Sequence, residues 1–154
     1  MIACFGTILE MANEFFTSKQ AAEITGCSLR QLQYWRDKGV IVPTVSASGT
    51  GRSIYYSRSE LVELAVMGYW LSVGLSFETA LKALQMLGDK ELQYSSLDRS
   101  RHLMLVWEWK GRSLMLLEFN HETAHAALDK GLPVIPVWLD AIHQRLQNAL
   151  ERST

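Results

Sequence analysis

The sequence predicts an α+β fold in which short helices alternate with β-hairpins. Capping boxes mark three helix starts. In each, a Ser or Thr is followed three residues later by Gln or Glu, which satisfies two unpaired backbone donors; they are Thr17…Gln20, Ser28…Gln31 and Ser57…Glu60. Apolar runs flank Gly-containing turns at 46–51 and 110–112, which is typical of β-hairpins. A chain of 154 residues is long enough for one large domain or two small ones.

Short helices and one hairpin fill the first half of the chain. The first box opens a predicted helix over 18–25 ended by Gly26, and the second opens one over 29–38 ended by Gly39. Two short helices joined by a three-residue turn are typical of a helix-turn-helix. The stretch 40–57 predicts a hairpin, which would be a wing. Two further helices, 58–73 and 77–87, are expected to end at Gly74 and Gly88.

The second half predicts a smaller α/β module. Strand-like runs at 103–109 and 113–119 form a hairpin, a helix capped by Asn120 follows, and then come a third strand at 134–137 and a helix from 140 to about 151. The stretch 89–102 is polar and lacks helical periodicity. The predicted organisation is therefore a tail over 1–15, a winged helix-turn-helix over 16–88, a linker over 89–102 and an α/β module over 103–154.

Charge is unevenly distributed along the chain. The net charge is −1, yet residues 17–60 carry six basic and three acidic residues. A locally basic face on a neutral protein suits a partner bound on one side, such as DNA. No apolar run approaches the roughly 18 residues of a membrane span, and two cysteines do not suggest a disulfide framework. We expect a cytoplasmic, nucleoid-associated protein without a membrane partner, in which Cys27 is a small buried hydrophobe.

Residues 16–87 resemble the MerR-type transcriptional regulators. The residues that carry the resemblance are Phe16-Thr17, Ala21-Ala22, Thr25-Gly26, Leu32, Tyr34-Trp35-Arg36-Asp37-Lys38-Gly39-Val40, Tyr56-Ser57, Glu60-Leu61 and Gly74-Leu75-Ser76-Phe77. The resemblance implies a bacterial, dimeric, non-enzymatic regulator that binds double-stranded DNA between promoter elements and distorts it. This chain departs from the family in having Gln33 before the aromatic pair, no heptads over 89–102 after the fourth helix and no cysteine beyond Cys27. A thiolate metal sensor is therefore not expected, and no cofactor is implied.

A helical wheel places the predicted DNA contacts of the second helix on one arc of about 100°. Arg30 and Gln31 lie in the first turn, where a recognition helix meets base edges. Tyr34 and Lys38 suit phosphates, and the helix-start amides behind Thr17 could hold another. Arg52 at the tip of the wing could reach the backbone or minor groove, with Tyr56 at the end of the wing. The predicted DNA-binding residues are Thr17, Arg30, Gln31, Tyr34, Lys38, Arg52 and Tyr56.

The second half leaves several alternatives open. His121, Glu122 and His125 match the H-E-x-x-H zinc-hydrolase pattern, but a module of about fifty residues is small for a substrate cleft. Trp107, Trp109 and Trp138 either pack in the core or line an effector pocket. The hairpin face and an apolar stripe on the last helix together predict a dimer interface. A DNA-binding antitoxin or phage-type accessory factor, binding a protein through this module, is the main alternative function.

Overall fold

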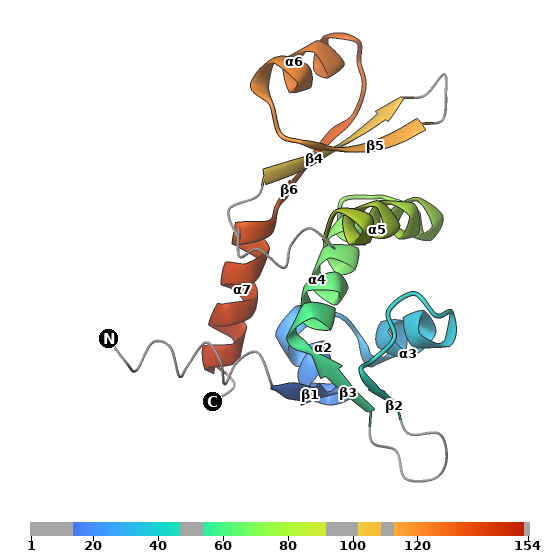
Figure 1. Cartoon of the computed structure of the whole chain (residues 1–154), viewed down its shortest axis with the longest axis vertical. Helices are drawn as coiled ribbons and strands as arrows, with labels where there is room; N and C mark the ends of the chain where they lie inside the picture. The colour runs from blue at the N-terminus through green and yellow to red at the C-terminus, as the bar shows by residue number, and fades with distance from the viewer. Residues whose placement is uncertain (1–13, 47–53, 92–101, 109–112, 153–154) are drawn as a thin grey trace. The chain divides into compact units, whose positions relative to one another are not determined.

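The computed structural model describes residues 14–46, 54–91, 102–108 and 113–152 (Figure 1). The chain divides into two compact units, Met1–Tyr69 with Leu146–Thr154, and Trp70–Arg145. Two helices, α4 (Arg58–Ser72) and α7 (Leu139–Arg152), contribute residues to both units. None of the helices among the described residues combines the length and apolar character needed to cross a membrane.

The first unit contains the predicted pair of short helices. They are α2 (Ser18–Thr25) and α3 (Leu29–Asp37), both opened by complete capping boxes. Gly26 and Gly39 follow them with φ of 77° and 68°, left-handed conformations that favour glycine. The predicted helix at 58–73 is observed as α4, one residue shorter. The predicted starts of these three helices are thus confirmed, and their ends are confirmed to within one residue.

A small antiparallel sheet accompanies these helices. Its strands are β1 (Phe15–Thr17), β2 (Val45–Ser46) and β3 (Ile54–Ser57), in the order β1-β3-β2. The predicted tail over 1–15 is wrong at its last residue, because Phe15 pairs with Ser57 just as the neighbouring Phe16 pairs with Tyr56. A three-residue strand is too short to show the alternation of apolar and polar residues that predicts a strand. Its partner β3 also lies far along the chain, so the pairing could not be recognised from local sequence. The turn between β2 and β3, with the predicted contact Arg52, lies outside the described residues.

The first unit has a well-filled apolar core. Apolar residues buried in it come from all its described helices, from its sheet and from the connecting segments: Phe16, Ala21, Ile24, Cys27, Leu32, Trp35, Ile41, Tyr56, Leu61, Val62, Leu64, Val66, Met67 and Leu146. The Cys27 Sγ atom lies 3.5 Å from the carbonyl oxygen of Leu64. A Cβ atom added to Gly68 would lie 3.1 Å from the same sulfur. Cys27 is therefore the small buried hydrophobe that the sequence predicts.

The burial of Cys27 predicts an unreactive thiol. Burial raises its pKa above the ordinary value of a thiol, and a hydrogen bond with Thr25 opposes the rise in part. Because the thiolate is the reactive form, a Cys4→Ser variant should react with Ellman's reagent much more slowly when native than in urea. Equal rates in the two conditions would contradict this burial.

The second unit is built on a three-stranded antiparallel sheet. Its strands are β4 (His102–Glu108), β5 (Ser113–Glu118) and β6 (Val134–Trp138), in the order β5-β4-β6. The helix α6 (His121–Asp129), capped by Asn120, lies between β5 and β6 in sequence. The other helix wholly within this unit, α5 (Phe77–Glu91), continues through Gly88, so the predicted helix end at that glycine is wrong. A glycine inside a helix costs only about 1 kcal/mol relative to alanine, and buried Ala83, Leu84 and Leu87 hold this helix.

Each face of this sheet is covered by a helix (Figure 1). Met104 and Val106 of β4 form a buried cluster with Ala124 and Ala127 of α6. Leu103 and Leu105 alternate with them, so they face the opposite side of the sheet and are also buried. There α5 packs against β5. The sheet therefore has two protected faces, and its two outer strands form its edges.

Candidate nucleic-acid interface

The helix α3 has one buried side and one exposed side. Leu32 and Trp35 are buried in the core, whereas Arg30, Tyr34 and Lys38 are exposed at successive turns. The Lys38 Nζ atom lies 5.7 Å from the centre of the Tyr34 ring, within range of a cation–π interaction. The structure therefore brings three of the predicted DNA-binding residues onto one surface, which can offer cationic and hydrogen-bonding groups.

Gln31 lies in the first turn of α3 but serves its N-terminal cap. Its backbone amide donates to the Ser28 hydroxyl (3.1 Å), and its side-chain oxygen accepts from the Ser28 amide (2.9 Å). Bidentate recognition of adenine requires both the oxygen and the nitrogen of a side-chain amide. Since this oxygen is already bonded, the base contact predicted for Gln31 competes with the cap.

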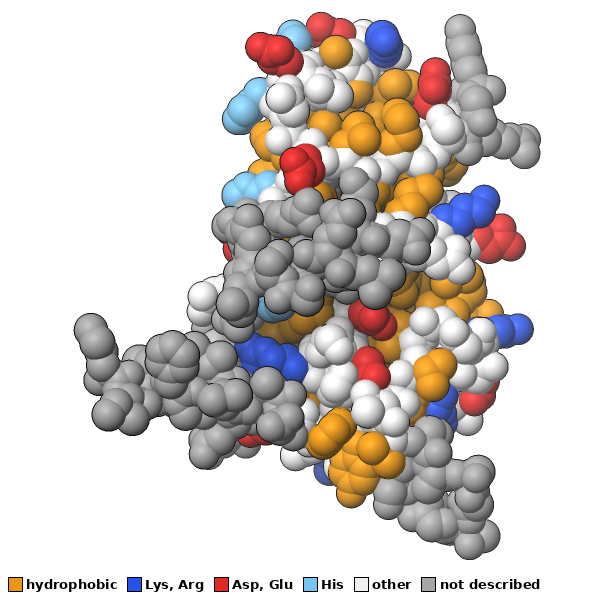
Figure 2. Space-filling view, in the orientation of Figure 1, with side chains coloured by type: hydrophobic (Ala, Val, Ile, Leu, Met, Phe, Trp, Pro, Cys, Tyr) orange, Lys and Arg blue, Asp and Glu red, His pale blue; other side chains and the backbone are white. Residues whose placement is uncertain are grey.

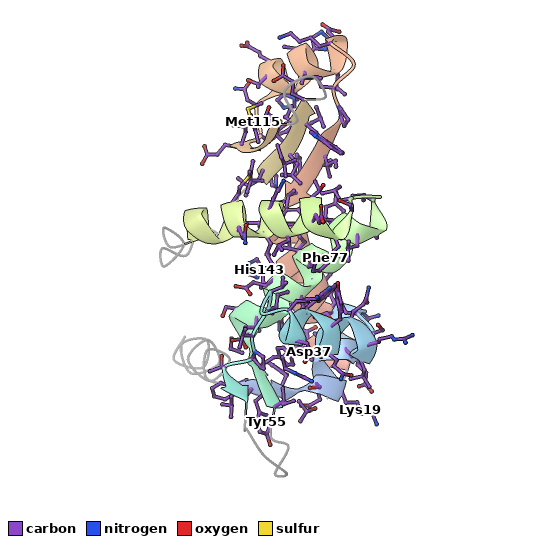
Figure 3. The ribbon with its side chains drawn as sticks, turned by 90° about the vertical axis from the view of Figure 1, so that its right-hand side faces the viewer. Lys19, Asp37, Tyr55, Phe77, Met115 and His143 are labelled. Carbon is purple, nitrogen blue, oxygen red and sulfur yellow. The ribbon has the colours of Figure 1, made fainter. Side chains whose placement is uncertain are left out.

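Thr17 begins α2 in the same manner. Its hydroxyl accepts from the Gln20 amide (3.2 Å), and its own amide donates to the side-chain oxygen of Gln20 (2.9 Å). The predicted phosphate contact must therefore use other first-turn amides of α2. Lys19, labelled in Figure 3, is exposed beside them. A phosphate bound here would meet both backbone N–H groups and a cationic side chain.

Tyr56 is fully buried, with 0% of its surface exposed. Burial raises the pKa of its hydroxyl, and nearby Arg36 opposes the rise. The surface role that the sequence analysis gave to Tyr56 does not fit this placement. Strand residues alternate between faces, so pairing of Tyr56 with buried Phe16 turns Tyr55 to the other side.

The outward face of the small sheet carries an aromatic residue that the sequence analysis missed. Tyr55 pairs with Thr17 on one side and Val45 on the other, which places the three in one row across the sheet. Figure 3 labels Tyr55, and Figure 2 shows hydrophobic side chains at the surface over this sheet. Alternation along β3 could have identified Tyr55 once Tyr56 was assigned to the core. Tyr55 thus belongs with Thr17 in the candidate interface.

Comparison with known proteins agrees with this geometry. The family described as MerR HTH family regulatory protein matches residues 16–87. Residues 16–87 form a MerR-family helix-turn-helix domain. Relatives include uncharacterised HTH-type transcriptional regulators of Mycobacterium tuberculosis (strains H37Rv and CDC 1551) and Mycobacterium bovis, each 29% identical over 79 residues. That match spans 51% of this chain and 35% of each relative.

Within the MerR-family domain, one carboxylate holds the hairpin to the start of α4. Glu60 accepts from the Ser57 amide (2.6 Å), as its capping box predicts. It also accepts from the Thr44 amide (3.1 Å) and the Thr44 hydroxyl (2.6 Å), just before β2. The contact with Thr44 joins segments far apart in sequence, so the capping pattern alone could not reveal it. Glu60 thereby fixes both strands of the hairpin relative to α4.

The histidines of the H-E-x-x-H pattern lie outside the MerR-family domain and have other partners. His125 Nε2 lies 3.2 Å from Asp129 Oδ2, and the ring of His121 packs edge-on against Phe119 with centroids 4.9 Å apart. Over the described ranges, no group of three His, Cys, Asp or Glu side chains is arranged to hold a metal ion. The geometry of the described residues therefore gives no support to a zinc site.

Proposed function

We propose that this protein is a dimeric transcriptional regulator that inserts the exposed side of α3 into the major groove of promoter DNA. The observation that carries the proposal is the surface formed by Arg30, Tyr34 and Lys38, opposite the buried residues of α3. The positive charge of residues 17–60 supports contact with phosphates. Two copies would read two half-sites, because a single short recognition helix makes few contacts.

Each exposed group suits a particular part of the DNA. Arg30, in the first turn of α3, can make two hydrogen bonds to a guanine edge. Tyr34 and Lys38 lie further along the helix and suit the phosphate backbone. The β2–β3 hairpin would act as the wing, with Tyr55 and Arg52 toward the adjacent backbone or minor groove. Gln31 would contact a base only if it left its cap.

The proposed organisation assigns residues 16–88 to DNA and residues 103–154 to assembly. The second module would join two copies and could also receive an effector or a partner protein. This arrangement replaces a coiled coil after the fourth helix, because residues 89–102, which follow that predicted helix, have no heptad pattern. Regulation would take place in the cytoplasm, at the nucleoid.

Substitutions on α3 test the DNA-binding surface. With genomic fragments selected by the parent protein, Arg30→Ala should weaken binding by about 1–3 kcal/mol and relax base preference. Lys38→Ala should weaken all sequences alike and reduce the slope of log affinity against log salt by about 1. Lys130→Ala, which removes an exposed lysine from the second module, is the matched control. Unchanged mobility-shift titrations for both α3 variants would show that another surface binds DNA.

A further inference from the structure

The two edges of the β5-β4-β6 sheet differ in their backbone groups. The amide of Phe119, directly after β5, donates to the carbonyl of His102 (2.9 Å). Because bonded and non-bonded pairs alternate in an antiparallel ladder, Ser113, Met115 and Leu117 direct their backbone groups toward β4. Leu114 and Leu116 therefore direct theirs away from the sheet. Among the described residues, β5 pairs only with β4.

The opposite edge is closed by a proline. The amide of Trp107 donates to the carbonyl of Pro133 (3.3 Å). This bond shows which residue pairs between β4 and β6 are hydrogen-bonded and which are not. Pro136 pairs with Met104 at a position whose backbone nitrogen faces away from the sheet. Since proline has no N–H, the outer edge of β6 lacks a donor at its centre. Natural proteins use this device to prevent strand addition.

The side chains of β5 also favour association. Met115 is 39% exposed, although it shares a sheet face with the buried cluster beneath α6. Its neighbours Leu114 and Leu116 are apolar, and the only charged residue of the strand is Glu118 at its end. Such an apolar edge lacks the charges and proline that usually block pairing.

We propose that the outer edge of β5 pairs with β5 of a second copy of this chain, so that the two sheets join into one. The choice of a second copy rests on the proposed function, because a regulator that reads two half-sites needs two identical chains. With the twofold axis perpendicular to the sheet, each helix-covered face continues into the same face of the partner. A residue of β5 whose backbone groups point toward β4 must then lie opposite a partner residue of the same kind.

The exposure of Met115 selects the register. When Met115 lies at the twofold axis it meets Met115 of the partner, and the outward-facing Leu114 bonds with the partner's Leu116. Met115 then occupies a non-hydrogen-bonded pair, in which the Cα atoms lie about 4.5 Å apart. This separation falls within the range that a disulfide bridges. The contact also removes an exposed methionine from water.

Cysteine cross-linking tests the pairing directly. In a Cys4→Ser background, Met115→Cys should give a covalent dimer under mild oxidation. Ser113→Cys is the matched control on the same face of β5. In this register the two copies of residue 113 lie about 13 Å apart, so Ser113→Cys should stay monomeric on a non-reducing gel. Equal cross-linking of the two variants, or none with Met115→Cys, would overturn the proposal.

Blocking the edge tests the same contact without cysteines. Leu114→Pro removes an outward donor but none of the bonds to β4, and it acts twice in a symmetric dimer. We expect self-association about 10- to 100-fold weaker by sedimentation. Met115→Lys should act in the same direction, whereas Leu128→Lys, at the 58% exposed apolar residue of α6, should not. A parent that is monomeric at tens of micromolar, or edge variants that dimerise like the parent, would overturn the proposal.

Mobility shifts with the same proteins separate this inference from the proposed function. If the parent dimerises through β5 but shifts no DNA fragment, the β5 pairing is supported and the proposed regulatory function is wrong. If the parent shifts DNA as a dimer and all edge variants remain dimeric, the proposed function is supported and the β5 pairing is wrong.

Discussion

Trp35→Ala is expected to lower the free energy of unfolding of the MerR-family domain by about 3–5 kcal/mol, the usual cost of removing a buried aromatic side chain. Trp35 is 2% exposed and lies on the side of α3 that faces the core. Its removal leaves a cavity between α3 and the rest of the first unit. Because the exposed surface of α3 depends on this packing, DNA binding should fall with the folded fraction.

The neighbouring Tyr34→Ala is the matched control for Trp35→Ala. Tyr34 is 47% exposed on the opposite side of the same helix. Surface substitutions usually change stability by about 0.5 kcal/mol or less, so Tyr34→Ala should unfold at nearly the parent's urea midpoint in circular dichroism. It should nevertheless weaken DNA binding. A parent-like midpoint for Trp35→Ala would mean that α3 does not pack as described.

Helix starts and ends were predictable from the sequence wherever the signal was local. The boxes at Thr17 and Ser28 and the glycines at 26 and 39 act within one helical turn, so each can be identified without knowing the rest of the fold. Gly88 does not end its helix, because burial of Leu87 and its neighbours outweighs the modest helix penalty of glycine. The strand β1 was missed because only its pairing with β3 defines it.

The candidate interface was predictable to the same extent. The 100° spacing of a helix places Arg30, Tyr34 and Lys38 on one side of α3, and the structure has them exposed there. The sequence could not assign Tyr55 and Tyr56 to faces, because that choice depends on which residue pairs with Phe16. It also gave Gln31 two roles, in the cap and on DNA, and the observed hydrogen bonds favour the cap.

Glu60→Ala should lower the free energy of unfolding by about 2–3 kcal/mol, since it leaves hydrogen-bond donors of Thr44 and Ser57 without their acceptor. Glu60→Gln is the matched control. A glutamine oxygen can accept from both backbone amides, and its nitrogen can donate to the Thr44 hydroxyl. The Gln variant should therefore lose less than about 1 kcal/mol. Equal losses for the two variants in urea unfolding would show that charge, not hydrogen bonding, is what Glu60 contributes.

The same two variants separate electrostatics from positioning in DNA binding. Both remove one negative charge from the domain, which by itself should strengthen binding to phosphates. Glu60→Ala also releases the hairpin from α4, so it should bind DNA more weakly than the parent despite its more favourable charge. Glu60→Gln keeps the hydrogen bonds and should bind as well as the parent or better. If Glu60→Ala, measured well below its unfolding midpoint, binds as tightly as Glu60→Gln, then the β2–β3 hairpin takes no part in holding DNA.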